Sequence, residues 1–200
     1  MGKLGYLCRS MPIDALQDKA TQYVAGAMTA PEREAFEVLL EFHGDLGRQV
    51  ASLLDTSAAM ALTGTPRATP PTTLRARILH TLDALPPREG PESRVVTDAR
   101  GLVEWINPAF TDMCGYTLSE LKGRKPGAVL QGPETDQAAV TRIREALQAR
   151  QACRETVVNY HKDGSTYRAD IRMDPILDEA GEPLWFVARE RKLTAAAVAV

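Results

Sequence analysis

A run of short, separately capped helices between residues 107 and 133 constrains this fold more than any other feature of the sequence. Asn107-Pro108 begins the first helix, because asparagine is a good N-cap and proline is favoured in the first helical turn. Thr117, with Glu120 three residues later, forms a capping box for the second helix. Glycine and proline at 123, 126, 127, 132 and 133 then break the chain repeatedly. Short, differently aimed helices of this kind, laid across a sheet, are expected to enclose a pocket.

Strand patterns surround these helices. Residues 95–97 and 103–106 flank a turn and predict a first hairpin. Lys162-Asp163-Gly164 predicts a second hairpin, between strands at 155–161 and 165–177. In the strand at 165–177 apolar and charged residues alternate, which predicts one buried and one charged face. With a helix from 135 or 136 to about 150 and a last strand at 184–188, we expect five antiparallel strands with helices on one face.

The region before residue 86 is predicted to be entirely helical. A helix at 13–28 is followed by a capping box, Thr29 to Glu32, that starts the next one. A further helical stretch carries Leu46, Val50, Leu53, Leu54 and Ala58 as its apolar face and stops at Gly64. The last helix has one stripe of four aliphatic residues: Leu74, Ile78, Leu82 and Leu85. The predicted fold class is therefore α+β, with an all-α domain at 11–85, a linker at 86–93 and a sheet domain at 94–194.

Composition and charge exclude several classes of function. A net charge of −2 and the lack of a Lys/Arg stripe argue against direct nucleic-acid binding. No apolar run approaches the roughly 18 residues that predict a membrane span, and the N-terminus has no signal-peptide pattern. Three widely spaced cysteines indicate a reducing compartment, so we expect a cytoplasmic protein. No phosphate loop, nucleophile elbow or metal-ligand spacing occurs, so we predict no enzyme, no catalytic residue and no metal site.

Three motifs in the second half occur in an order that resembles a known family. They are N-P-A-F-x4-G-Y-x3-E-L-x-G from residue 107, L-Q-G-P-E-T-D from residue 130 and N-Y-x-K-D-G from residue 159. Together they resemble a PAS domain over about 94–194, and within that family they look most like the LOV flavin photosensors. The resemblance implies a PAS fold, a sensory role and a ligand pocket.

The resemblance also implies how flavin would be held, and this chain departs from that pattern. In the LOV photosensors a cysteine after G-R-N attacks the excited flavin, but here the place is taken by Pro126, so no adduct chemistry is expected. Two asparagines and a glutamine hold the flavin ring in that family. Asn159 matches the first, Ala169 stands at the second and Glu190 at the glutamine. The cofactor stays open: we expect none, with flavin held in part by Asn159 as the alternative.

The helical region resembles a second family. The run A-x2-Y-V-A-G-A-M-T-A-P-E-R-E-A-F-E-V-L-L from residue 20, with the Pro-rich connector and last helix, resembles the anti-sigma domain of bacterial regulators that sequester alternative sigma factors. Its zinc signature would fall on Leu39, His43 and Leu46, and because leucine cannot ligate zinc, the resemblance is to the zinc-free branch.

The two resemblances lead to one main hypothesis and two alternatives. The main hypothesis is a regulator whose PAS sensor controls the binding of an extracytoplasmic-function sigma factor, with Leu74, Ile78, Leu82 and Leu85 at the contact. One alternative is a PAS signalling module whose helices form a dimerisation or partner-binding bundle, and homodimerisation through the PAS domain is compatible with both. The other alternative is a flavin-based light or redox sensor.

Overall fold

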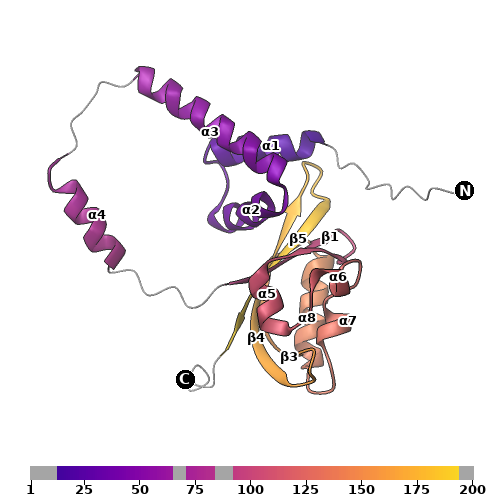
Figure 1. The fold of residues 1–200 in the computed structure, drawn as a ribbon. Coiled ribbons are helices and arrows are strands. Elements are labelled where there is room, and N and C mark those ends of the chain that lie inside the picture. Colours follow the sequence, from indigo (N-terminus) through magenta and orange to yellow (C-terminus); the bar gives the residue numbers. More distant parts are fainter. Residues whose placement is uncertain (1–12, 65–70, 84–91, 194–200) are drawn as a thin grey trace, which may run out of the picture.

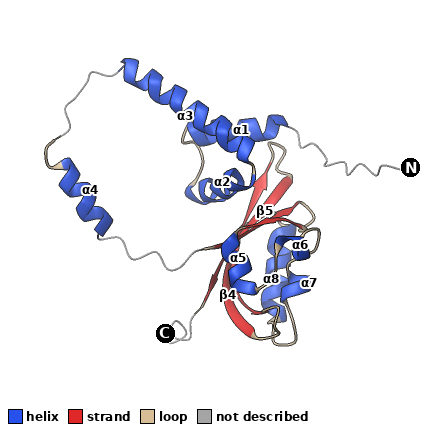
Figure 2. Ribbon diagram, viewed as in Figure 1, coloured by secondary structure: helices blue, strands red, loops and turns tan. Residues whose placement is uncertain are grey.

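The computed structural model describes residues 13–64, 71–83 and 92–193, and these ranges form an α+β fold, as the sequence predicts (Figures 1 and 2). Four helices come first: α1 (Ile13–Val24), α2 (Ala30–Phe42), α3 (Gly44–Gly64) and α4 (Leu74–Asp83). The rest is β1 (Ser93–Asp98), β2 (Val103–Ile106), α5 (Pro108–Cys114), α6 (Leu118–Leu121), α7 (Gly127–Leu130), α8 (Gln137–Gln148), β3 (Cys153–Tyr160), β4 (Thr166–Leu177) and β5 (Pro183–Lys192). Within the described ranges, no helix is both long and apolar enough to cross a bilayer.

The predicted caps are present and fix where the short helices begin. The Asn107 side chain accepts a hydrogen bond from the Phe110 amide at 3.0 Å and another from the Arg94 amide at 2.9 Å, so it joins α5 to β1. The Thr117 amide donates to Glu120 Oε2 at 3.0 Å, and the Thr29 amide donates to Glu32 Oε2 at 2.9 Å. These caps satisfy donors that a helix start otherwise leaves free, which is why local sequence alone located them.

The five strands form one antiparallel sheet in the order β2-β1-β5-β4-β3. The last strand of the chain therefore lies at the centre, paired with β1 on one side and β4 on the other. Residues that alternate along β5 face opposite sides of the sheet. The predicted Lys162-Asp163-Gly164 turn joins β3 to β4, with Gly164 at φ 86° in the left-handed region that glycine adopts without strain.

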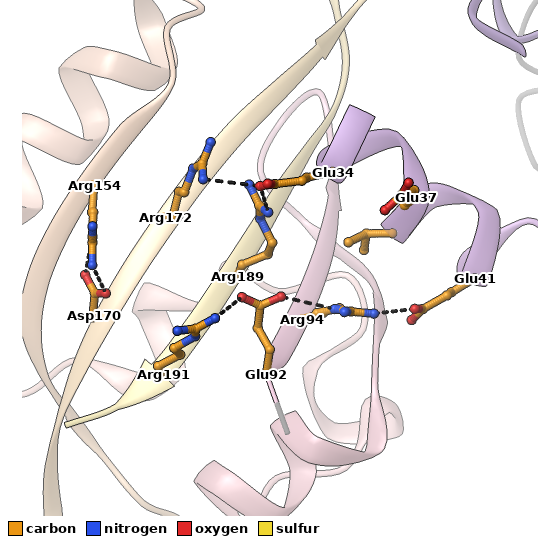
Figure 3. Close-up of a pocket in the computed structure, with 11 residues that line it drawn as sticks. Glu34, Glu37, Glu41, Glu92, Arg94, Arg154, Asp170, Arg172, Arg189 and Arg191 are labelled. Carbon is orange, nitrogen blue, oxygen red and sulfur yellow. Dashed lines mark hydrogen bonds and ion pairs between the residues drawn. The ribbon is translucent and has the colours of Figure 1, made fainter. Parts of the chain in front are cut away.

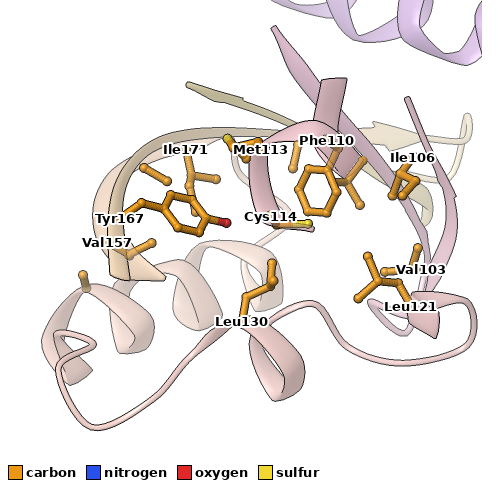
Figure 4. Packing of buried hydrophobic residues seen from close by; sticks show 14 residues of the cluster. Val103, Ile106, Phe110, Met113, Cys114, Leu121, Leu130, Val157, Tyr167 and Ile171 are labelled. Atoms are coloured by element: carbon orange, nitrogen blue, oxygen red, sulfur yellow. The ribbon is translucent and has the colours of Figure 1, made fainter. Parts of the chain in front are cut away.

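The inner face of the sheet carries the main hydrophobic core under α5–α8 (Figure 4). Phe110 and Cys114 of α5, Leu121 of α6 and Leu130 of α7 are almost fully buried against strand residues. The strand residues and the remaining helix residues of this core are Val95, Val103, Ile106, Met113, Ala139, Val157, Tyr167, Ala169, Ile171 and Ala188.

The outer face of the sheet is partly covered by the N-terminal helices. Val96, Ile176, Trp185 and Val187 on this face belong to one hydrophobic cluster with residues of α1, α2 and α3, chiefly Ala20, Ala35, Phe36, Val38, Leu39, Leu46 and Val50. Sequence alone predicted only a charged, uncovered face here. It is charged, but α2 lies across it and pairs with its arginines. The helices α1–α3 and the sheet therefore share a core and do not pack as two independent bodies.

The structure differs from the expected helices in three places. The first helix ends at Val24, because Gly26 turns the chain at φ 67°. The third continues without a break through Gly47, and beyond Val50 all of residues 51–63 are exposed, so Leu53, Leu54 and Ala58 do not pack inward as predicted. The reason is length: α1 and α2 are 12 and 13 residues long, and α3 is 21. The fourth helix lies apart from the others (Figure 1).

Candidate functional site

A cavity of about 440 Å³ lies between the inner face of the sheet and the helices α7 and α8. That volume is within the range of small-molecule and cofactor sites, roughly 300–1,000 Å³. Its walls are mostly apolar, with Ile171 and Met173 from β4 and Ile143 and Leu147 from α8. A few polar side chains are directed into this apolar space, which is the composition of a site that binds one ligand in one orientation.

Two buried polar side chains, on strands that flank β4 in the sheet, line the cavity. Asn159 of β3 and Glu190 of β5 are 3% and 4% exposed. Glu190 Oε2 is buried and has no hydrogen-bond partner among the described residues, and burial raises the pKa of this carboxyl to about 7. Near neutral pH Glu190 is therefore present in both forms, so it can donate as well as accept a hydrogen bond. Burial and the nearby Glu190 charge also raise the pKa of Tyr167, whose hydroxyl is buried close to Asn159.

Basic side chains line another part of the same cavity. Three basic residues contribute to its lining: Arg100 in the β1–β2 turn, Lys125 before α7 and Arg144 of α8. Arg100 is also paired with Asp98 at 3.0 Å. A ligand that carries one polar ring edge and one anionic group would meet complementary side chains in this lining.

Cysteine does not line this cavity within the part of the chain that the structure describes. Pro126 and Gly127 line it at the place where the photosensor thiol is expected. Cys114 is completely buried on α5 in the main core, and burial raises the pKa of its thiol. Ala169 is likewise buried and offers no hydrogen bond. The residues present fit a flavin nucleotide in cavity size, at Asn159 and at the three basic side chains, and they depart from the photosensor pattern at Ala169 and Glu190.

The L-Q-G-P-E-T-D motif holds the loop before α8 onto β3. Thr135 Oγ1 donates to the Val158 carbonyl at 2.6 Å, and the Glu134 amide donates to the Tyr160 hydroxyl at 2.9 Å. Gly132 lies so close to the Tyr160 ring that a Cβ there would stand 2.5 Å from a ring carbon. Asp136, one of the two predicted caps of α8, accepts from the Ala138 amide at 2.9 Å. The motif thus shapes one wall of the cavity.

The outer face of the sheet holds a second, highly charged cleft, of about 450 Å³, beneath α2 (Figure 3). Arg189 of β5 donates to Asp174 Oδ2 at 2.8 Å and is paired with Glu34 of α2. Arg172 of β4 also reaches Glu34, at 3.3 Å, and Arg94 of β1 is paired with Glu41 of α2. The hydrogen bond from Arg189 holds the pKa of Glu34 below its usual value. We call Glu34, Asp174, Arg172 and Arg189 the α2 latch.

The predicted partner-binding residues of α4 and the histidine at the expected zinc position lie outside the cavity. Leu74 and Ile78 are 37% and 50% exposed on α4, while the side chain of Leu82, and Leu85 entirely, lie outside the described residues. His43 caps the C-terminus of α2, with its ring centre 4.2 Å from that of Phe42 and 5.2 Å from that of Trp185.

The α2 latch was missed by sequence reasoning. Glu34 has the charge pattern of a solvated helix face, and its partner Arg189 lies 155 residues away in the chain. The only available signal was the capping box at Thr29, which fixes where α2 starts and hence which side chains share its faces.

Comparison with known proteins agrees with this geometry. Residues 91–189 match the family model described as "PAS domain". Residues 91–189 form a PAS domain. Related sequences include the nitrogen fixation regulatory protein of Klebsiella pneumoniae, 31% identical over 99 residues, which are 50% of this chain and 20% of that protein. The blue-light-activated histidine kinase 1 of Erythrobacter litoralis is 33% identical over 92 residues, 46% of this chain and 25% of that protein.

Solved structures place the PAS domain among the LOV-like members. The light-state structure of the blue-light photoreceptor Aureochrome1 LOV superposes with a TM-score of 0.50 at 29% identity, covering 52% of this chain and 84% of that one. This chain spans about a quarter or less of the length of the two relatives named above, and the match to them is through the PAS domain.

Proposed function

We propose that this protein is a signalling module whose PAS domain binds a ligand in its cavity and thereby changes how firmly α2 is held on the outer face of the sheet. One observation supports this above all others: Glu190 and Arg189 are consecutive residues of β5 with opposite surroundings. Glu190 lines the cavity, and Arg189 belongs to the α2 latch. A ligand that orders or ionises Glu190 would move the same strand that carries the main latch residue.

The ligand to test first is a flavin nucleotide. The relatives include proteins named as blue-light receptors, and the cavity suits a flavin in its volume, at Asn159 and at its basic side chains. Bound flavin would supply a chromophore with reversible redox chemistry. The chain's own residues would then orient its polar edge through Asn159, exchange a proton or hydrogen bond at Glu190 and exclude water with the apolar wall of α8. Since no thiol among the described residues lines the cavity, redox change is the signal we propose, and not adduct formation.

This proposal is tested by measuring ligand binding in the cavity and the stability of α2 on the sheet in the same protein. Full-length protein is titrated with flavin mononucleotide, and binding is followed by quenching of flavin fluorescence, with amide hydrogen exchange of α2 as the second readout. We expect binding to change exchange in α2, and Asn159→Ala to weaken binding at least tenfold. Glu34→Ala should raise exchange in α2 and, because coupling between two sites is reciprocal, should also change flavin affinity. The proposal is wrong if wild-type protein does not bind flavin mononucleotide, or if binding leaves amide exchange in α2 unchanged.

The partner we propose is a sigma factor of the extracytoplasmic-function class, in the cytoplasm. Support comes from the resemblance of the helical region to anti-sigma domains and from the exposure of Leu74 and Ile78 on α4. Burying one such side chain contributes roughly 1.5–3 kcal/mol. Ile78→Asp would remove that gain and place an unpaired charge in the contact, so affinity should fall more than about tenfold.

The matched control is the double variant Arg75→Ala and Arg77→Ala, which changes residues flanking the aliphatic stripe and should matter less. The measurement is titration of full-length variants against the sigma factor encoded nearby. If wild-type protein binds no sigma factor, or if Ile78→Asp binds equally well, the partner belongs to another class. The alternative of a PAS module with a helical interaction region would then stand.

A further inference from the structure

Glu190 is a buried carboxyl on the inner side of β5 that forms no salt bridge with any described residue. It lines the cavity, and its Oε2 has no hydrogen-bond partner within the described ranges. Its neighbours in sequence, Arg189 and Arg191, line the charged cleft under α2 instead, because successive residues of a strand face opposite sides of the sheet. An unpaired carboxylate is costly to bury, so these surroundings favour the neutral acid.

The groups packed around Glu190 are themselves neutral. On the flanking strands it lies in register with Ser93 of β1 and Ile171 of β4, a hydroxyl and an apolar side chain. Two titratable groups sense its charge, Tyr167 of β4 and Cys114 of α5. Burial raises the pKa of both, so both are uncharged near neutral pH. Neither can therefore compensate an ionised carboxyl.

The charged groups of the cavity are unfavourable for a cationic ligand. Three basic residues line the same cavity: Arg100, Lys125 and Arg144. Lys192, the next residue on the Glu190 side of β5, is exposed, and its amine lies 3.2 Å from Nε2 of His161. A ligand that paired its own positive charge with Glu190 would be repelled by these side chains. The ligand that suits the lining is neutral or anionic.

A bound ligand also removes the water that can reach the carboxyl. Ile143 and Leu147 of α8 and Met173 of β4 give the cavity apolar walls. With the space filled, an ionised Glu190 would have neither water nor a cation beside it. The protonated form can instead donate its O–H to an acceptor on the ligand, and a hydrogen bond to the neutral form stabilises that form further.

We propose that the cavity takes a neutral or anionic ligand with a hydrogen-bond acceptor for Glu190, and that binding takes up one proton at this carboxyl. The proton comes from the solvent, and the O–H bond of the acid is the one bond that forms. This inference rests on the ligand-binding function proposed above, and it specifies the protonated acid as the form in which the ligand orders Glu190.

The sign of the pH dependence follows from the two states of the carboxyl. Its pKa is about 7 in the free protein and higher in the complex. Affinity is therefore fully present below the pKa of the free protein and is lost as pH rises above it, by up to about tenfold per pH unit.

The first test is the pH dependence of flavin affinity in the full-length protein. The probe is riboflavin, because it carries no phosphate, a group that ionises near pH 6 and would add a pH dependence of its own. Quenching of its fluorescence gives the Kd at pH 6 and at pH 9. We expect affinity to fall at least about tenfold between these two values.

The variant Glu190→Gln separates this carboxyl from other sources of pH dependence. Its amide offers a donor at every pH, so affinity should stay constant from pH 6 to 9 and should exceed that of wild type at pH 9 about tenfold. Glu155→Gln is the matched control, since Glu155 is paired with Arg142 and does not line the cavity, and it should keep the wild-type fall. Circular dichroism at both pH values shows whether each variant is folded.

The second test counts the proton. Calorimetric titration with riboflavin at pH 8, in two buffers of different ionisation enthalpy, measures proton uptake. Wild type should take up about one proton per bound riboflavin, and Glu190→Gln none. Wild-type affinity that is constant from pH 6 to 9 without proton uptake overturns this inference and leaves the flavin proposal standing. So does a Glu190→Gln variant that keeps the wild-type fall. Absence of riboflavin binding at every pH overturns the flavin proposal and this inference together.

Discussion

Asp174 accepts a 2.8 Å hydrogen bond from Arg189 while both side chains are more than nine-tenths buried. Asp174 Oδ1 and Arg189 Nε have no partner within the described residues. A buried ion pair of this kind adds little net stability, but losing one member leaves an uncompensated charge in the interior.

The first prediction concerns this pair. Asp174→Ala should lower the free energy of unfolding by about 3 kcal/mol, because Arg189 loses its buried acceptor and keeps only Glu34, whose side chain is half exposed. The double variant Asp174→Leu and Arg189→Met removes both charges and should be more stable than Asp174→Ala alone. Urea denaturation measures both. If the losses of Asp174→Leu and Arg189→Met, each measured singly, simply add in the double variant, Asp174 and Arg189 do not interact energetically.

The second prediction is a pH dependence caused by Glu190. Its pKa is about 7 in the folded protein and about 4.3 when unfolded, so the folded state binds more protons between these values. The free energy of unfolding therefore falls as pH rises from roughly 4.5 to 7, and the contribution levels off above that.

Glu190→Gln cannot ionise, so its free energy of unfolding should lack this fall. Between pH 5 and 8 the difference in free energy of unfolding between the variant and wild type should shift in favour of the variant by an amount on the order of 3 kcal/mol. The control is Glu155→Gln, at a partly buried side chain whose pKa is lowered by its hydrogen bond with Arg142, and it should show no such gain in this range. Denaturation curves at several pH values decide the matter. Parallel profiles for wild type and Glu190→Gln would contradict the burial of a protonatable carboxyl.

The third prediction tests why glycine stands in the L-Q-G-P-E-T-D motif. Gly132→Ala would place a methyl group 2.5 Å from the Tyr160 ring, so either the loop or the ring must shift. We expect a loss of about 1–3 kcal/mol in thermal or urea unfolding. Gly44→Ala, where the nearest atom is an Arg48 side-chain nitrogen at 3.9 Å, should cost nothing.

The fourth prediction concerns light. If the purified protein holds flavin, blue light should not bleach the flavin band reversibly, because no thiol lines the cavity within the described residues. Absorption spectra of wild type and Cys114→Ala should respond alike to illumination, since Cys114 is buried in the core. A reversible bleach that disappears in Cys114→Ala would show that this thiol reaches the ligand.

Sequence predicted best where the cause is local. The caps at Asn107 and Thr117 and the turn at Gly164 depend on a few neighbouring residues, and all three are where the pattern put them. Asn159, which the family resemblance singled out as a flavin contact, lines the cavity because the register of β3 and β4 carries it there, and its role in binding stays a prediction.

What sequence missed depends on packing between distant segments. Alternation along β4 marked Arg172 and Asp174 as solvent-facing, which is the usual meaning of charge on one side of a strand. Their surroundings instead include Glu34, which approaches only because Phe36 and Leu39 on the same helix bury themselves on the sheet. Neither the α2 latch nor the exposure of residues 51–63 of α3 follows from a sequence pattern within one helix or strand.

The central place of β5 makes assembly of the sheet depend on the strand that follows the other four in sequence. β1 and β2 form one hairpin, β3 and β4 another, and only β5 hydrogen-bonds to both. During synthesis the two hairpins therefore have no strand between them until the residues up to Lys192 have left the ribosome. Trp185, Val187 and Arg189, which contribute to the surface under α2, come from that same strand. The helices α1–α3, although synthesised first, therefore pack on the sheet last. A chain cut before Pro183 would leave their apolar sides exposed.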